Sequence, residues 1–84
     1  MDREALKQQY HYLWLEANNL YENAKQVAYG TVKGREVWIA YLEKKHEYAV
    51  KVQSVNAADL AQDIQEEKQA LQRLIEGQRE NRGK

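Results

Sequence analysis

Apolar residues in the first third of the chain recur at alternating spacings of four and three, the pattern of one helix face. A second apolar row lies beside the first and widens that face. The two rows are Leu6, Tyr10, Leu13, Ala17, Leu20, Ala24 and Val27, and then Trp14, Tyr21 and Ala28. We therefore predict a helix over residues 3–29, capped by Asp2 and ended by Gly30 in a left-handed conformation.

The rest of the chain predicts a turn and further helix. Gly30 and Gly34 bound the turn, since glycine relaxes the backbone. A second helix is predicted over residues 35–53, although Val50 and Val52 would also suit a strand. A third is predicted over 57–77, followed by a frayed polar tail over 79–84. The apolar residues of these two helices are Trp38, Tyr41, Leu42, Tyr48, Ala49, Val52, Val55, Leu60, Ala61, Ile64, Leu71, Leu74 and Ile75.

Whether residues 35–77 form one helix or two is a narrow choice, because no glycine or proline separates the segments. The apolar row that ends at Val52 and Val55 is out of phase with Leu60, and Ser54 or Asn56 could cap a new helix, with Asp59 in a capping-box position. We favour a break, which gives three antiparallel helices closed into a compact bundle. An unbroken helix would instead reach about 60 Å and leave its end for a second chain.

The expected fold class is all-α: an antiparallel helical hairpin or three-helix bundle with coiled-coil-like packing, and oligomeric. Oligomerisation is expected because a core of this size supplies only about 3–5 kcal/mol and the chain has no cysteine for a disulfide. The residues expected to pack the helices or a self-association seam are Leu6, Tyr10, Leu13, Trp14, Ala17, Leu20, Tyr21, Ala24, Val27, Trp38, Tyr41, Leu42, Leu60, Ile64, Leu71 and Leu74.

Three large side chains fall outside the predicted apolar rows. They are Tyr12, Tyr29 and Ile39. Tyrosine is enriched where protein surfaces recognise each other, so these residues are the candidate contacts for a partner. Isolated surface aromatics are also common in proteins that use them for nothing, and this reading stays open beside the first.

The charge balance argues against a nucleic-acid binder, because 13 Lys+Arg are matched by 13 Asp+Glu. A modest basic patch of Lys44, Lys45 and Lys51, together with the basic end of the chain, keeps that function as the alternative. Glu43 and Glu47 interrupt the patch, so a solvated mixed-charge helix face is the plainer interpretation.

The sequence offers no set of catalytic groups. It has one serine, one threonine and no cysteine, and it lacks phosphate-binding glycine loops and zinc spacings. Glu43 and His46 have the Glu-x-x-His spacing of helical metal sites, but the motif occurs once and both residues lie off the predicted apolar row. We therefore expect no enzyme activity, no metal and no cofactor.

These patterns predict a small non-catalytic helical protein that binds another protein, as an adaptor, inhibitor or assembly factor, and that forms a homodimer or larger homo-oligomer. Short proteins of this kind are common in mobile genetic elements. No apolar run approaches a membrane span, and no signal peptide begins the chain, so the cytoplasm is the expected compartment.

Overall fold

The computed structural model describes the backbone of residues 2–82 and the side chains of residues 2–78. Its elements are four helices: α1 (Arg3–Gln9), α2 (His11–Lys25), α3 (Val32–Lys51) and α4 (Ala57–Arg82). The chain is therefore all-helical over the described residues, as predicted. None of these helices has the length and apolar character needed to cross a membrane.

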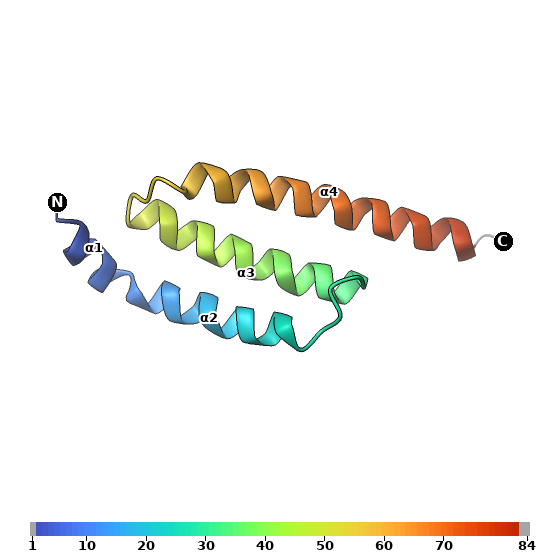
Figure 1. The fold of residues 1–84 in the computed structure, drawn as a ribbon, viewed down its shortest axis with the longest axis horizontal. Coiled ribbons are helices and arrows are strands. Elements are labelled where there is room, and N and C mark those ends of the chain that lie inside the picture. Colours follow the sequence, from blue (N-terminus) through green and yellow to red (C-terminus); the bar gives the residue numbers. More distant parts are fainter. Residues whose placement is uncertain (1, 83–84) are drawn as a thin grey trace.

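The predicted first helix is divided at Tyr10, where α1 ends and α2 begins (Figure 1). Tyr10 leaves the helical conformation, with φ −105° and ψ 15°, and its carbonyl accepts a tight hydrogen bond from the Leu13 amide at 2.9 Å. No glycine or proline signals this kink. Asp2 caps α1 as predicted, because its carboxylate accepts a hydrogen bond from the Glu4 amide.

The connection from α2 to α3 corrects two predicted boundaries. α2 ends at Lys25, before the predicted end at residue 29, and Gly30 has no positive φ. α3 begins at Val32 because the Thr31 hydroxyl accepts a hydrogen bond from the Gly34 amide at 2.9 Å. Gly34 therefore lies inside the first turn of α3, where a Cβ atom would overlap the carbonyl oxygen of Ala28.

Two helices, and not one, follow that connection, so the favoured break near residue 54 is present. Gln53 adopts a left-handed conformation with φ 57° and ends α3. The Ser54 amide donates to the Ala49 carbonyl, and the Gln53 amide donates to the Val50 carbonyl. This pair of bonds is a Schellman motif, which glycine usually makes. The Ser54 hydroxyl, and not Asp59, contacts the Asn56 amide at the start of α4.

The helices form one open layer instead of the compact closed bundle that was predicted. α3 lies in the middle, with α2 packed along one side and α4 along the other, and neighbours run antiparallel (Figure 1). The layer measures 58 × 24 × 11 Å, so it is one helix thick. α4 continues to Arg82, past the predicted end at residue 77, and extends beyond the start of α3 (Figure 1). Residues 83–84 of the predicted tail lie outside the described residues.

The core follows the two seams of this layer. Its buried hydrophobic residues are Leu6, Leu13, Ala17, Ala24, Ile39, Leu42, Ala49, Val52, Leu60 and Ile64. Leu20 of α2 is half-buried, and so are Leu71 and Leu74 of α4. Seven of the predicted packing residues are therefore buried in the single chain: Leu6, Leu13, Ala17, Ala24, Leu42, Leu60 and Ile64.

One expectation about burial is wrong. Ile39 was predicted to be an exposed partner contact, but it is 6% exposed and belongs to the core. α3 packs on two neighbours, so residues beyond its main apolar row are covered as well. Trp14 and Tyr21, predicted to pack the helices or a self-association seam, are 45% and 37% exposed, because no helix among the described residues covers the broad face of the layer.

Candidate interaction surface

Four aromatic side chains form a continuous cluster on one broad face of the layer. Tyr21 comes from α2, Tyr29 from the connection, and Trp38 and Tyr41 from α3. The ring centroid of Trp38 lies 6.3 Å from that of Tyr21, 6.1 Å from Tyr29 and 5.2 Å from Tyr41. Tyr21 and Tyr41 are also 5.2 Å apart. We call these four residues the aromatic cluster, and the side of the layer that carries them the aromatic face.

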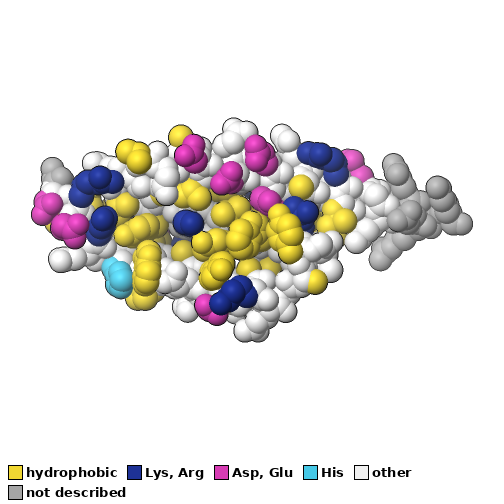
Figure 2. Space-filling view, in the orientation of Figure 1, with side chains coloured by type: hydrophobic (Ala, Val, Ile, Leu, Met, Phe, Trp, Pro, Cys, Tyr) yellow, Lys and Arg dark blue, Asp and Glu magenta, His cyan; other side chains and the backbone are white. Residues whose placement is uncertain are grey.

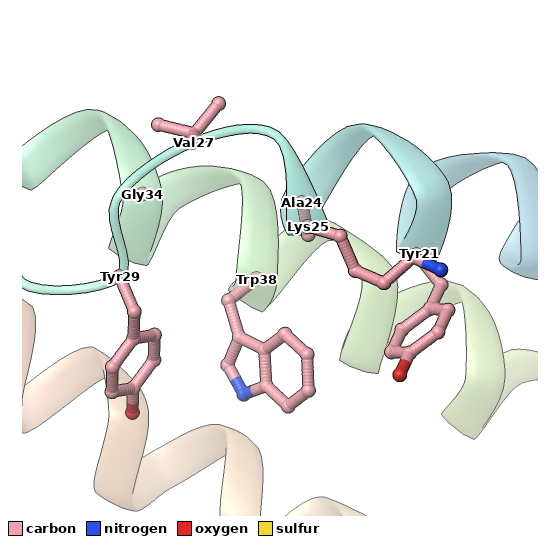
Figure 3. A pocket seen from close by; sticks show the side chains of 7 residues that line it. All are labelled: Tyr21, Ala24, Lys25, Val27, Tyr29, Gly34 and Trp38. Carbon is pink, nitrogen blue, oxygen red and sulfur yellow. The ribbon is translucent and has the colours of Figure 1, made fainter.

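The local structure of each element explains why the rings meet. Trp38 and Tyr41 are three residues apart on α3 and therefore project from the same side of that helix. Tyr29, Trp38 and Tyr21 project in the same direction, whereas Val27 points the opposite way (Figure 3). In the view of Figure 2, hydrophobic side chains form a band along the middle of the molecule.

Cationic side chains lie over three of the four rings. Lys25 Nζ is 5.1 Å from the ring centroid of Tyr21, and Lys45 Nζ is 5.6 Å from that of Tyr41. The guanidinium carbon of Arg35 is 4.1 Å from the centroid of Tyr29. Such contacts combine electrostatic attraction with burial of the aliphatic stems. Two of these cations are also ion-paired, Lys25 with Glu22 and Arg35 with Glu67, at 3.1 Å each, so the aromatic face is apolar with mixed charge at its edges.

A hollow of about 410 Å³ opens on this face beside the turn. Its lining residues are Tyr21, Ala24, Lys25, Val27, Tyr29, Gly34 and Trp38 (Figure 3). The hollow is mostly apolar, and the ammonium group of Lys25 supplies a charge at its edge. A side chain from a partner protein is the kind of group that such a shallow apolar site accommodates.

Tyr29 joins the aromatic face to α4. Its hydroxyl donates a hydrogen bond to Glu67 Oε1 at 2.7 Å and accepts one from Arg35 Nη1 at 2.7 Å. The same Arg35 nitrogen is 3.1 Å from Glu67 Oε2. Burial and the hydrogen bond to Glu67 raise the pKa of the Tyr29 hydroxyl above its usual value. Arg35 Nε is buried without a hydrogen-bond partner among the described residues, and the stacked Tyr29 ring covers that guanidinium.

A second hollow, of about 250 Å³, lies at the α1 end of the layer. Trp14, Tyr48 and Val52 give it an apolar wall, and Arg3, Lys7 and Lys45 add positive charge. Trp14 stacks on His11, with centroids 5.3 Å apart and rings 16° from parallel. Lys45 connects this hollow with the aromatic cluster, so apolar and cationic groups continue along the face.

The other two predicted partner contacts, Tyr29 and Tyr12, differ in their surroundings. Tyr29 is exposed and belongs to the aromatic cluster. Tyr12 is 54% exposed, but among the described aromatic rings it neighbours only Tyr10, at 6.4 Å. Sequence reasoning missed Tyr21, Trp38 and Tyr41 as surface residues, because helical spacing placed them in the core. The available signal was that each carries a polar atom suited to a half-buried position.

The three lysines of the predicted basic patch, Lys44, Lys45 and Lys51, each contact different residues. Lys44 Nζ lies 3.1 Å from Glu47 and 3.3 Å from Glu16, and these hydrogen-bonded partners raise the pKa of its ammonium group. Lys45 lies over Tyr41, and Lys51 lies over Tyr10 with 5.8 Å between nitrogen and centroid. The structure therefore does not bring these residues into one patch.

Glu43 and His46 line a shallow hollow between α3 and α4 together with Lys68. Glu43 Oε2 is 3.5 Å from Lys68 Nζ, so this carboxylate already has a cationic partner. Within the part of the chain that the structure describes, no three His, Cys, Asp or Glu side chains gather as a metal would need.

Comparison of the chain with protein-family models, with curated protein sequences and with solved structures finds no match in any of the three. The surface itself therefore carries the functional argument.

Proposed function

We propose that the chain is a small non-catalytic helical protein that binds another protein through its aromatic face, as an adaptor, inhibitor or assembly factor, and that also self-associates. The observation that carries this proposal is the aromatic cluster, in which Tyr21 and Tyr29 are 37% and 46% exposed beside cationic side chains. Tyrosine, tryptophan and arginine are the residues that dominate protein interfaces when they cluster.

The shape of the molecule also supports a binding role. A layer one helix thick has little interior in which to exclude water from a reaction, whereas it offers a broad, flat contact area. The hollow beside Trp38 can receive one anchoring side chain of a partner.

A matched pair of substitutions on α2 tests the proposal. Tyr21→Glu places a charge on the aromatic face, and Tyr12→Glu places the same charge elsewhere on that helix. Partner capture from the source cell should survive Tyr12→Glu and be lost with Tyr21→Glu, with both variants keeping the helical circular dichroism of the parent. Capture that depends on Tyr12 and ignores Tyr21 would move the binding surface off the aromatic face.

Nucleic-acid binding is the second candidate, favoured by the cations that lie over exposed rings. Single-stranded nucleic acids bind surfaces that combine stacking with positive charge. The residues concerned would be Lys25, Arg35 and Lys45 instead of the Lys44–Lys45–Lys51 patch. Tryptophan fluorescence quenched by oligothymidylate, with an affinity that falls steeply as salt rises, would select this function over protein binding.

A further inference from the structure

We infer that a second copy of this chain covers the aromatic face, with the twofold axis running along α3, so that α4 of each copy lies over α1 and α2 of the other. The inference deepens the proposed function, since it names one occupant for the same face. Three properties of the molecule lead to it: its thickness, its exposed area and the distribution of its charges.

The thickness shows what the fold lacks. Stable domains pack two layers of secondary structure around one core, but this chain supplies a single layer 11 Å thick. Leu13 is the one described residue of the core that is large and completely enclosed. A second layer stacked on the aromatic face would enclose Trp38 and Tyr41, which now have one open side. A twofold-related copy supplies that layer with matching dimensions.

The exposed area gives the size of the missing contact. The chain exposes 6071 Å², whereas a compact monomer of 9.9 kDa exposes about 5,200 Å². The excess of about 900 Å² is close to the roughly 800 Å² that each partner buries in a standard protein interface. The overhanging end of α4 and the aromatic face both contribute to this excess, and one contact of standard size with another copy would remove about as much surface.

The two edges of the aromatic face differ in charge. Residues 57–67 of α4 contain four acidic residues and no Lys or Arg. Asp59, Asp63 and Glu67 are spaced by four, and Glu67 accepts the hydrogen bond from Tyr29, so this row lies along the α4 edge of the face. Acidic side chains lie over α4 in Figure 2. The opposite half of the face carries Arg3, Lys7 and Lys25, of which Lys7 and Lys25 also pair with Glu4 and Glu22 of their own helices, and Lys45 lies between the two halves on α3.

Only one of the two face-to-face twofold arrangements brings acidic residues of α4 near the basic residues of α1 and α2. An axis along the helices places the acidic row of one copy over α1 and α2 of the other. Arg3 and Lys7 lie at the same end of the layer as Leu60, so the acidic and basic groups are also level along the axis. An axis across the helices would stack α4 on α4 and bring like charges together.

Sedimentation equilibrium of the purified chain tests the dimer. We expect the parent chain to sediment with about twice the 9.9 kDa mass at micromolar concentration. Tyr21→Glu should sediment as a monomer with unchanged helical circular dichroism, and Tyr12→Glu should remain a dimer. Asp63→Lys, which alters no apolar contact, should weaken the dimer at least tenfold. A parent chain that stays monomeric at these concentrations overturns the inference, and so does a Tyr21→Glu dimer.

Single-cysteine variants test the arrangement, since the chain has no cysteine of its own. A mixture of Lys25→Cys and Asp63→Cys chains, treated with a short bismaleimide, should give a mixed cross-linked dimer. Lys25→Cys alone should cross-link poorly, because the two copies of α2 lie at opposite edges. Efficient cross-linking of Lys25→Cys to itself would overturn this arrangement.

These outcomes are distinguishable from failure of the proposed function. If the parent chain is monomeric but still captures a different protein through Tyr21, the proposed dimer is wrong and the proposed binding of another protein stands. If the chain is a dimer but substitutions in the aromatic cluster do not affect the capture of another protein, the second copy is supported and the binding of another protein through this face is not.

Discussion

Tyr29 shows how one side chain can serve both folding and surface chemistry. Its ring lies against Trp38 and Arg35 on the aromatic face, and its hydroxyl reaches Glu67 on α4. The connection that carries it has no helical hydrogen-bond ladder along most of its length. The contacts of Tyr29 therefore hold that connection against both α3 and α4.

Tyr29→Phe keeps the ring and removes the hydroxyl, so it should lower the free energy of unfolding by about 0.5–1 kcal/mol. The pKa of Tyr29 is raised in the folded chain, so its contribution is complete below the pKa of an unfolded tyrosine and is lost as pH rises through the folded value. Urea unfolding across alkaline pH checks both points. The difference between parent and variant should shrink above about pH 10; a constant difference would contradict the role of the protonated hydroxyl.

Gln53 is a second residue whose conformation matters more than its side chain. It occupies the left-handed region at the end of α3, where side chains other than glycine cost free energy. Gln53→Gly should therefore raise the free energy of unfolding by about 1 kcal/mol, and Gln53→Ala should not raise it. Thermal unfolding of the two variants at equal concentration measures this. A Gly variant less stable than the parent would show that the turn needs the glutamine side chain.

At the level of the helices, α3 depends on close approach of its first turn to the preceding connection. Gly34 is buried, and a methyl group there would overlap the backbone of Ala28. Gly34→Ala should lower the free energy of unfolding by about 1–3 kcal/mol, because the backbone must move to make room. Gly77→Ala is the control, since that site is open, and it should be neutral or stabilising. Chemical denaturation of both variants tests the contrast.

Two leucines of α2 differ in burial: one is buried in the seam with α3 and the other is exposed. Leu13 is 2% exposed and Leu15 is 48% exposed. Leu13→Ala should cost about 2–5 kcal/mol of unfolding free energy, whereas Leu15→Ala should change it by less than about 0.5 kcal/mol. Similar losses in denaturant unfolding of the two variants would mean that α2 is rotated relative to the arrangement described above.

Sequence periodicity predicted the helices well but placed several of their ends and neighbours wrongly. The Leu13–Ala17–Ala24 row is buried as expected, because residues on one helix face share a neighbour. Gly34 was assigned to a turn because glycine disfavours helices, although close packing requires it within α3. Periodicity also cannot state how many neighbours a helix has. Ile39 is buried because α3 lies between two helices, and Tyr21 is exposed because α2 lies at an edge.

The candidate surface was predicted less well than the fold, for a related reason. Tyr29 was found because it lies outside the apolar row. Tyr21, Trp38 and Tyr41 lie within it, and only the single-layer arrangement shows that one side of these rings faces outward. One feature of the sequence could have indicated this surface. Its apolar rows contain tyrosine and tryptophan, which suit half-buried positions, and a chain of this length forms too few helices to bury all of them.

Across the whole molecule, the main helix contacts join helices that are neighbours in the chain: α1 with α2, α2 with α3, and α3 with α4. Such a layer folds through local contacts, but its edge helices gain support from one side only. α4 is the clearest case, because it extends beyond the start of α3 (Figure 1) and its Leu71 and Leu74 are only half-buried. Stability of the layer should therefore respond strongly to whatever covers its open face.

That dependence gives a thermodynamic prediction for the whole chain. If the native form is a dimer and the unfolded form is not, mass action raises the melting temperature with protein concentration. We expect the parent chain to show this rise in calorimetry, with Tyr12→Glu following it. Tyr21→Glu should melt at one temperature at all concentrations, and below the parent, because it also loses the contacts of the Tyr21 ring with Trp38 and Tyr41. A concentration-independent melting temperature for the parent would mean that the single layer is stable alone, so the exposed aromatic cluster would be left for a different protein.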